Sequence, residues 1–588
     1  MSSNERLVSR RSFLGACGAC GAAAAGATPW LAGCAAPSAA RGRRPNIVLI
    51  MVDDMGYSDI GCYGAEIRTP NLDRLAAGGM RFTHGYNNAI CAPTRASLMT
   101  GLYPHQVGIG TNIAKLNDPF WSTKPWPGYQ SFRRETAAMI PELLRPAGYQ
   151  TFMAGKWHLG DEPERWPVHR GFDRSFALVW GGSEHFKPRW APFALDGQPY
   201  TEFPADFYTT DYFTKYAIEF VDRADRERPY FLYLSYSAPH LPWEAWPEDI
   251  AKYKGAYAPG WEEIRRRRFA RQKEMGLFAP GVRLPPRDPE GAGAESDPDR
   301  AKWAERLEVY AAMIDRVDQN VGRLLEAIER RGERENTLIL FLSDNGAWAT
   351  RFSGLPWAET GNTPFRLFKG WNHEGGICTP LIAHWPGRVP AGTINRRQYA
   401  HVKDFMPTFL DLAGAAHPRT FEGHRILPLE GRSFLPALLD PDAAHNTPVF
   451  WECGGNGAMR DGRWKLVRFF NEGRMGPEAN EPPRTGAWEL YDLETDPTEI
   501  DDLASREPGR LRAMAAAHEA WARRVGVVPQ EEIARALKAF REREQQQAPP
   551  GARADPRRAA RSDVFAGARP RIAAPVPNRA DRQGRGAT

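Results

Sequence analysis

The chain has 588 residues, 42% of them hydrophobic and 25% charged, so it can form one large domain with a smaller one and is neither fibrous nor wholly disordered. Its net charge of +6 is concentrated at the ends: residues 1–44 carry +5 and residues 548–588 carry +6, which leaves −5 on the remainder. Because the body of the chain shows no basic patch, nucleic acid is excluded as a partner.

The N-terminal residues 1–44 predict an export signal. Ser9-Arg10-Arg11-Ser12-Phe13-Leu14 places two arginines before a Gly/Ala-rich stretch, which resembles a twin-arginine signal. Leu31-Ala32-Gly33-Cys34 resembles a lipobox, in which Cys34 would be lipidated and become the mature N-terminus. We therefore expect the twin-arginine machinery to export the folded chain to the periplasm or cell surface, anchored through Cys34. A soluble exported protein cleaved nearby is the alternative.

Four short apolar runs are each followed by polar residues. The runs cover residues 46–52, 149–154, 230–236 and 338–342, and they are typical of strands buried on both faces. The residues that follow them are Asp53, Asp54, Lys156, His158, His240, Asp344 and Asn345. In open α/β sheets, ligands bind outside the carboxyl ends of the strands. The repetition therefore predicts one shared site.

The predicted fold class is α/β, with a large mixed, mostly parallel sheet flanked by helices. One apolar stripe at alternating spacings of three and four predicts a helix leading into the strand at 338–342; its members are Leu307, Tyr310, Ile314, Val317, Val321, Leu324 and Ile328. Residues 253–300 are charged, rich in proline and glycine and aperiodic, so we expect a surface insertion.

The sequence pattern changes after about residue 420. Residues 459–467 read as a turn between strands, and 489–493 as another strand of a small antiparallel sheet. A terminal helix is predicted within 509–541, and the Arg/Ala/Pro/Gly-rich end as a disordered tail. The expected organisation is a catalytic domain at 45–420, a C-terminal subdomain at 421–541 and the tail at 542–588.

Cys91-Ala92-Pro93-Thr94-Arg95 is the most informative segment. Pro93 suits the first turn of a helix that continues through residues 95–99, so Cys91 is expected beside the helix N-terminus. Backbone N–H groups there stabilise anions, and Arg95 adds positive charge. From position alone, a buried structural cysteine remains an equally simple explanation.

The segment, continued by Ala96-Ser97-Leu98-Met99-Thr100-Gly101, resembles the Cys-any-Pro-any-Arg signature of the sulfatase family. The resemblance covers roughly residues 45–510, in the family's order. It includes residues 46–56, 69–73, 155–160, 238–240, 343–346, Lys369-Gly370, Glu374-Gly375-Gly376 and 490–493. By this likeness the chain is expected to be an arylsulfatase-like sulfuric ester hydrolase.

The resemblance implies that a cytoplasmic formylglycine-generating enzyme oxidises Cys91 to formylglycine, which hydrates to a geminal diol. One hydroxyl would attack the sulfur of a sulfate ester and release the alcohol, and the other would then expel sulfate. Twin-arginine export of an already folded chain agrees with a modification made in the cytoplasm.

The same resemblance assigns the remaining site residues. Asp53, Asp54, Asp344 and Asn345 are hard oxygen ligands and, with modified Cys91, would hold Ca²⁺, or alternatively Mg²⁺. Arg95, Lys156 and Lys369 would neutralise the sulfate, His158 would hydrogen-bond the formylglycine, and His240 would act as general acid. Lys369 departs from the family pattern, because Phe365-Arg366-Leu367-Phe368 precedes it instead of a small, Gly-rich approach.

Two alternatives stay open: a phosphodiester or phosphonate ester hydrolase with a similar site, and a catalytically silent lipoprotein that binds sulfated glycans. Substrate specificity is expected in the loops at 111–135, 180–205 and 253–300. The first loop contains Trp121, Trp126 and Tyr129, and the second contains Trp180, Trp190 and Tyr200. These aromatic residues suit either sugars or aryl groups, so the substrate stays an aryl or carbohydrate sulfate.

Overall fold

The computed structural model describes residues 43–116, 119–286, 300–349, 355–470 and 485–547. Residues 1–42, which hold the predicted export signal and lipobox, lie outside the described residues, as do residues 548–588 of the predicted tail. Within the described part of the chain, no helix combines the length and apolar character needed to cross a membrane.

An eleven-stranded mixed sheet forms the centre of the fold, in the order β10-β2-β9-β8-β1-β7-β3-β4-β5-β6, with β11 paired to β2. Strands β8, β1, β7, β3 and β4 are mutually parallel, whereas β9 runs antiparallel to both of its neighbours. The predicted α/β class with a mostly parallel sheet is confirmed. The strands are β1 Asn46–Val52, β2 Met80–Tyr86, β3 Gln150–Lys156, β4 Arg174–Leu178, β5 Phe193–Leu195, β6 Gln198–Tyr200, β7 Tyr230–Ser235, β8 Thr337–Ser343, β9 Cys378–His384, β10 Thr393–Asn395 and β11 Ala400–His401.

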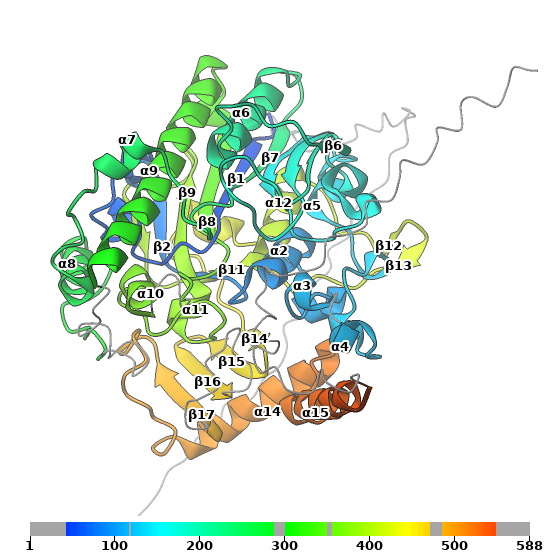
Figure 1. The fold of residues 1–588 in the computed structure, drawn as a ribbon, viewed down its shortest axis with the longest axis vertical. Coiled ribbons are helices and arrows are strands. Elements are labelled where there is room, and N and C mark those ends of the chain that lie inside the picture. Colours follow the sequence, from blue (N-terminus) through cyan, green and yellow to red (C-terminus); the bar gives the residue numbers. More distant parts are fainter. Residues whose placement is uncertain (1–42, 117–118, 287–299, 350–354, 471–484, 548–588) are drawn as a thin grey trace, which may run out of the picture. The chain divides into compact units, whose positions relative to one another are not determined.

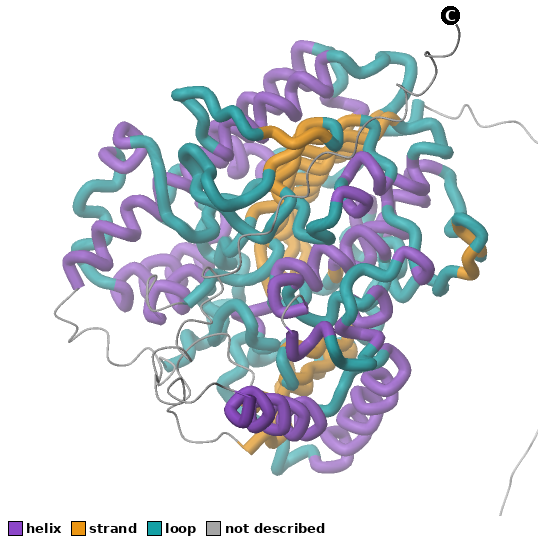
Figure 2. The backbone as a smooth tube through the Cα atoms, turned by 45° about the vertical axis from the view of Figure 1, so that its right-hand side comes forward, coloured by secondary structure: helices purple, strands orange, loops and turns teal. Residues whose placement is uncertain are grey.

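Helices cover both faces of this sheet (Figures 1 and 2). Alternate residues of β1 enter two different cores, Val48 and Ile50 on one face, Ile47 and Leu49 on the other, which explains the unbroken apolar run. The first core includes residues from α1 Pro70–Ala77, α6 Thr209–Asp222 and α9 Arg300–Arg330. The second includes residues from α2 Cys91–Thr100, α5 Ile140–Leu144 and α12 Phe405–Ala413. The predicted stripe of α9 lies entirely in the first core.

The C-terminal subdomain contains the predicted small antiparallel sheet, with four strands: β14 Val449–Cys453, β15 Asn456–Asp461, β16 Trp464–Phe470 and β17 Thr485–Asp492. Instead of one terminal helix over 509–541 there are two, α14 Pro508–Val525 and α15 Gln530–Gln547. Gly526, with a φ of 86°, ends α14 in the left-handed region that favours glycine. Because α15 reaches Gln547, the start of the predicted tail is helical.

Shorter elements complete the described chain. They are α3 Ile113–Leu116, α4 Pro119–Ser122, α7 Pro247–Ala251, α8 Trp261–Glu274, α10 Leu355–Gly361, α11 Glu374–Ile377, α13 Leu435–Leu439, and the two-stranded sheet of β12 Thr420–Phe421 and β13 His424–Arg425.

The expectation that residues 253–300 form an aperiodic surface insertion is wrong for α8. This helix buries Trp261, Ile264 and Phe269 in the first core, but it also buries Arg268 completely. Arg268 pairs with Asp59 at 2.6 Å and with Glu66 at 2.7 Å. A buried face built partly from paired charges carries no apolar periodicity, so the sequence pattern concealed the helix.

Removing the Arg268 guanidinium should therefore destabilise the fold. In Arg268→Met the Asp59 and Glu66 carboxylates lose their buried cation, and we expect a loss of about 3–5 kcal/mol in the free energy of unfolding. Urea denaturation measures this loss. Arg267→Met on the same helix is the matched control, because Arg267 is solvent-exposed and pairs with Glu263 on the surface. Equal unfolding free energies for the two variants would contradict a buried anchoring role.

Candidate active site

The ends of four adjacent strands bring the candidate residues together. Asp53 and Asp54 follow β1, Asp344 and Asn345 follow β8, Lys156 ends β3 with His158 just beyond, and His240 lies in the loop after β7. Cys91 is the first residue of α2, two residues earlier than the predicted start, and Lys369 precedes α11. The side-chain set is buried: its members Asp53, Asp54, Cys91, Arg95, Lys156, His158, His240, Asp344, Asn345 and Lys369 are each at most 6% exposed. The carboxyl edge of the sheet thus assembles all ten predicted residues.

Acidic and basic side chains interlock in this site. Lys156 contacts Asp53, and Lys369 donates to Asp54 Oδ1 at 2.6 Å. Arg95 donates to Asp344 Oδ2 through Nε at 3.1 Å and through Nη2 at 2.8 Å. Buried charges are tolerated when paired in this way.

Arg95 is held by further partners that the sequence did not reveal. Its Nη1 donates to the Lys156 carbonyl at 2.9 Å, to the Tyr233 hydroxyl at 3.2 Å and to Ser235 Oγ at 2.5 Å. Tyr233 and Ser235 stand two apart at the carboxyl end of β7, so they face the same side of the sheet. The two-residue spacing of these polar side chains at the end of a predicted strand was the feature of the sequence that could have indicated them. All the guanidinium nitrogens are committed to protein partners.

Two site residues have left-handed backbone conformations. Asp54 and His158 have φ angles of 65° and 57°, in the left-handed region. Gly181 packs on the His158 ring so closely that a Cβ at this position would lie 2.6 Å from it. Non-glycine residues persist in such conformations where the surrounding structure over-determines them, which is typical of functional sites.

Within the candidate site, three buried carboxylate or amide oxygens have no hydrogen-bond partner among the described residues: Asp53 Oδ1, Asp54 Oδ2 and Asn345 Oδ1. The other atoms of these groups are occupied, since Asn345 Nδ2 donates to Asp54 Oδ1 at 2.7 Å and Lys156 binds Asp53 Oδ2. Asp53 also lies with Cys91 and Asp344 in a group whose candidate ligand atoms are within 4.8 Å of one another. Unpartnered buried oxygens are costly, and hard oxygen donors in this number fit Ca²⁺ or Mg²⁺.

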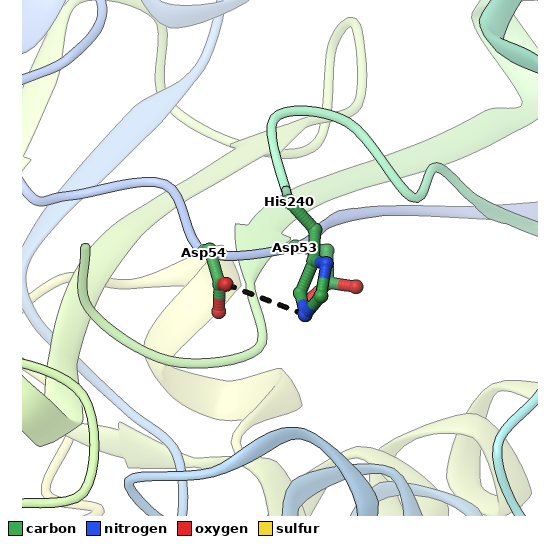
Figure 3. A group of neighbouring side chains, drawn as sticks. All are labelled: Asp53, Asp54 and His240. Carbon is green, nitrogen blue, oxygen red and sulfur yellow. Dashed lines mark ion pairs between the residues drawn. The ribbon is translucent and has the colours of Figure 1, made fainter. Parts of the chain in front are cut away.

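His240 faces the same carboxylates (Figure 3). Its Nδ1 donates to the Leu241 carbonyl at 2.6 Å, and this orients Nε2 toward Asp54 Oδ2 at 3.6 Å. The ring of Trp348 lies 5.3 Å from that of His240, and Lys369 Nζ lies 4.4 Å from the centre of the Trp348 ring. Trp348, which the sequence did not indicate as a site residue, therefore contacts both His240 and Lys369.

Burial and charge together shift the pKa values of the site. Burial lowers the pKa of His240 and, with Lys156, lowers the pKa of His158 well below its usual range. Burial raises the pKa of the Cys91 thiol. Burial of the Asp53 carboxyl acts to raise its pKa, but Lys156, His240 and Arg95 together outweigh this effect and lower it. Burial and the neighbouring Asp53 raise the pKa of Asp344. Both imidazoles therefore favour the neutral form unless a neighbouring negative charge stabilises the protonated ring.

Only part of the predicted specificity loops lies near the site. In the 180–205 loop, Trp190 is 38% exposed, and a Cβ on Gly182 would lie 3.2 Å from the His240 ring and 3.8 Å from that of Trp190. In the 111–135 loop, Trp126 donates to Glu532 at 3.1 Å and Tyr129 to Glu452 at 3.1 Å. These two aromatic residues pack on the C-terminal subdomain, which corrects the expectation that they face a substrate. His373 is buried against Glu489 at 3.1 Å.

Comparison with known proteins identifies related chains. The family model described as sulfatase matches residues 45–415, and one described as N-sulphoglucosamine sulphohydrolase, C-terminal, matches residues 365–516. An uncharacterised sulfatase of Schizosaccharomyces pombe is 32% identical over 81% of this chain and 93% of its own length. The arylsulfatase of Klebsiella aerogenes is 33% identical over 68% of this chain and 93% of its own length. Among solved structures, Ps i-CgsB superposes with a TM-score of 0.61 at 29% identity, covering 82% of this chain and 93% of that one.

Proposed function

The chain belongs to the sulfatase family and is a sulfate-ester hydrolase, and from this premise we propose that it acts through formylglycine made from Cys91 and a bound divalent metal. The observation that carries the proposal is the set of unpartnered oxygens on Asp53, Asp54 and Asn345, buried beside Cys91. A cation would satisfy these oxygens, and residue 91 lies where it would share that cation.

Asp53, Asp54, Asp344 and Asn345 would hold Ca²⁺, or Mg²⁺, together with modified residue 91. When bound, such a metal would supply positive charge that polarises the sulfate and favours ionisation of the attacking hydroxyl. The hydrated aldehyde supplies that hydroxyl and, in its second hydroxyl, a route for expelling sulfate. Side chains of the protein would bind the sulfate and transfer the proton to the leaving group.

Lys156 and Lys369 are the cations that we propose to meet the sulfate. Each is bound to a metal-site carboxylate, Asp53 or Asp54, and each carries positive charge to the place where negative charge develops. Arg95 has a different task, because its donors are already committed to Asp344 and to β7. We assign it to holding Asp344 and the start of α2 in position.

His240 is the proposed general acid. His240 Nδ1 donates a hydrogen bond to the Leu241 carbonyl, so Nε2 is the atom that would deliver a proton to the leaving oxygen. Burial lowers the His240 pKa, while the nearby Asp54 carboxylate partly offsets this by favouring the protonated ring. His158 would hydrogen-bond residue 91 in its neutral form, consistent with its strongly lowered pKa.

Replacing Cys91 tests the nucleophile. Cys91→Ala and Cys91→Ser should both lose turnover of p-nitrophenyl sulfate, because neither provides the thiol that the oxidising enzyme converts. The midpoint of thermal unfolding should stay close to that of the parent, since little core volume is removed. Mass spectrometry of the Cys91 peptide from the parent should show the oxidised residue. Substantial sulfatase activity in either variant would refute the mechanism.

Removing the metal tests the oxygen cluster. Chelation should abolish activity and lower the thermal unfolding midpoint, because the buried carboxylates then repel one another without a cation. Ca²⁺ or Mg²⁺ should restore both. The matched control is Asp54→Asn, whose unfolding midpoint should respond much less to added Ca²⁺. A demonstrably metal-free protein with full activity would contradict the metal site.

The substrate is proposed as an aryl or carbohydrate sulfate. Both classes have support among the relatives, since one is named an arylsulfatase and Ps i-CgsB has also been solved with k-i-k-neocarrahexaose. A screen of aryl, steroid and carbohydrate sulfates separates them. Phosphonate and phosphodiester substrates belong in the same screen, and preference for either would displace the sulfatase assignment.

We further propose that the chain is exported by the twin-arginine machinery and anchored through Cys34. Replacing Arg10 and Arg11 with lysine should retain active enzyme in the cytoplasm, and Cys34→Ala should remove the anchor. Cell fractionation with an activity assay distinguishes the steps. Parent protein confined to the cytoplasm would overturn export, whereas soluble parent protein outside the cytoplasm would overturn the anchor alone.

A further inference from the structure

We propose that a buried ion cluster between α11 and the C-terminal subdomain positions Lys369, so that Lys465, Glu374 and Glu499 are positioning residues of the active site. The inference rests on the proposed function, since it gives Lys369 a role in the reaction. It accounts for two sequence motifs that the catalytic chemistry leaves unused, Glu374-Gly375-Gly376 and the turn at residues 459–467.

The cluster consists of one cation between two carboxylates. Lys465 of β16 lies 2.6 Å from Glu374 Oε1 and 2.8 Å from Glu499 Oε1, and all three side chains are fully buried. The remaining carboxylate oxygens are also bound: Glu374 Oε2 accepts from the Tyr86 hydroxyl at 2.9 Å, and Glu499 Oε2 accepts from the Glu374 amide at 2.8 Å. Each member is therefore fixed in one orientation.

Glu499 holds both ends of the segment that carries Lys369. At one end, Arg366 Nη1 donates to the Glu499 carbonyl at 2.8 Å. At the other end, the Glu374 amide donates to the Glu499 carboxylate. The segment is closed on itself as well, because the Gly375 amide donates to the Arg366 carbonyl at 2.9 Å. Glu499 of the C-terminal subdomain thus fixes the positions of Arg366 and Glu374, between which Lys369 lies.

The held segment is in turn joined to the loops of the site. The Lys369 amide donates to the Ala347 carbonyl at 3.1 Å, and the Gly370 amide to the Ala89 carbonyl at 2.9 Å. The Gly346 amide, next to Asn345, donates to the Gly376 carbonyl at 3.1 Å. Backbone hydrogen bonds therefore link the segment of Lys369 to the loops of Cys91 and Asn345.

Close backbone contacts make this junction rigid. A Cβ on Gly346 would lie 1.9 Å from the Gly375 carbonyl oxygen, and one on Gly375 would lie 2.2 Å from that of Arg366. No side chain fits at either position, which explains why both Gly346 and Gly375 are glycine. A shift of Glu374 is accordingly transmitted to Lys369, whose Nζ sits 2.6 Å from Asp54.

A structural role alone would not require charge here. Replacing a buried ion pair by apolar residues is often neutral or stabilising, so three buried charges are weak contributors to folding. What they supply is a single geometry for the segment, and catalysis depends on such geometry: a displacement of about 1 Å can cost about 100-fold in rate.

The test is a double-mutant cycle between Lys465→Met and Lys369→Ala, measured as kcat and KM with p-nitrophenyl sulfate on the metal-loaded, modified protein. Lys465→Met should lower kcat/KM about tenfold or more in the parent but less than about twofold in the Lys369→Ala background. Lys403→Met is the matched control, because Lys403 is an equally buried lysine paired with Asp404 at 3.0 Å. Its effect should be the same in both backgrounds.

A second variant covers the case in which Lys465→Met fails to fold. Lys465→Met with Glu499→Gln keeps the net charge of the cluster and should fold, yet it removes both ion pairs of Lys465 and should couple to Lys369→Ala in the same way. Equal effects of the cluster variants in both backgrounds would overturn the positioning role. Parent-like activity in Lys369→Ala would instead refute the proposed function of Lys369, and with it this inference.

Discussion

The burial of three carboxylates at one sheet edge is the constraint on which the rest of this structure depends. Asp53, Asp54 and Asp344 are almost inaccessible to solvent, and like charges at such proximity oppose ionisation. Lys156, Lys369 and Arg95 each bind one of them, which balances the charge without filling every oxygen. The remaining unpartnered oxygens create a demand for a cation, and that demand links the fold to its chemistry.

The scaffold meets this constraint by restricting backbone movement around the charges. Asp54 adopts a left-handed conformation, and the loop that follows is anchored by Asp59, which accepts from the Gly56 amide at 2.8 Å. Tyr310 of α9 donates to the same carboxylate at 2.7 Å, and Arg268 of α8 pairs with it. Helices from distant parts of the sequence therefore hold the loop that contains two candidate metal ligands.

The C-terminal subdomain holds another loop of the site in a comparable way. Lys465 and Glu499 reach α11, as Arg268 and Tyr310 reach Asp59, and in both cases a buried charge fixes a short loop. Compared with apolar residues of similar size, whole buried ion pairs contribute little net stability, although removal of one partner alone is costly. Their role here is to select one arrangement among many compact ones. The subdomain is thereby a part of the active site, although it contributes none of the ten candidate side chains.

The sequence by itself determined four central strands of the large sheet, β1, β3, β7 and β8, and the candidate residues that follow them, because apolar runs and the residues after them are local features. It determined the family for the same reason, through short motifs in a fixed order. It did not reveal α8, whose buried face is made partly of paired arginines, nor the partners Tyr233, Ser235 and Trp348. It also misplaced Trp126 and Tyr129, which pack on the C-terminal subdomain. These features depend on contacts between charged and aromatic side chains that are far apart in the sequence. Only the tertiary structure decides which of these side chains meet, because burial of a charged or polar group is favourable only when it has a partner.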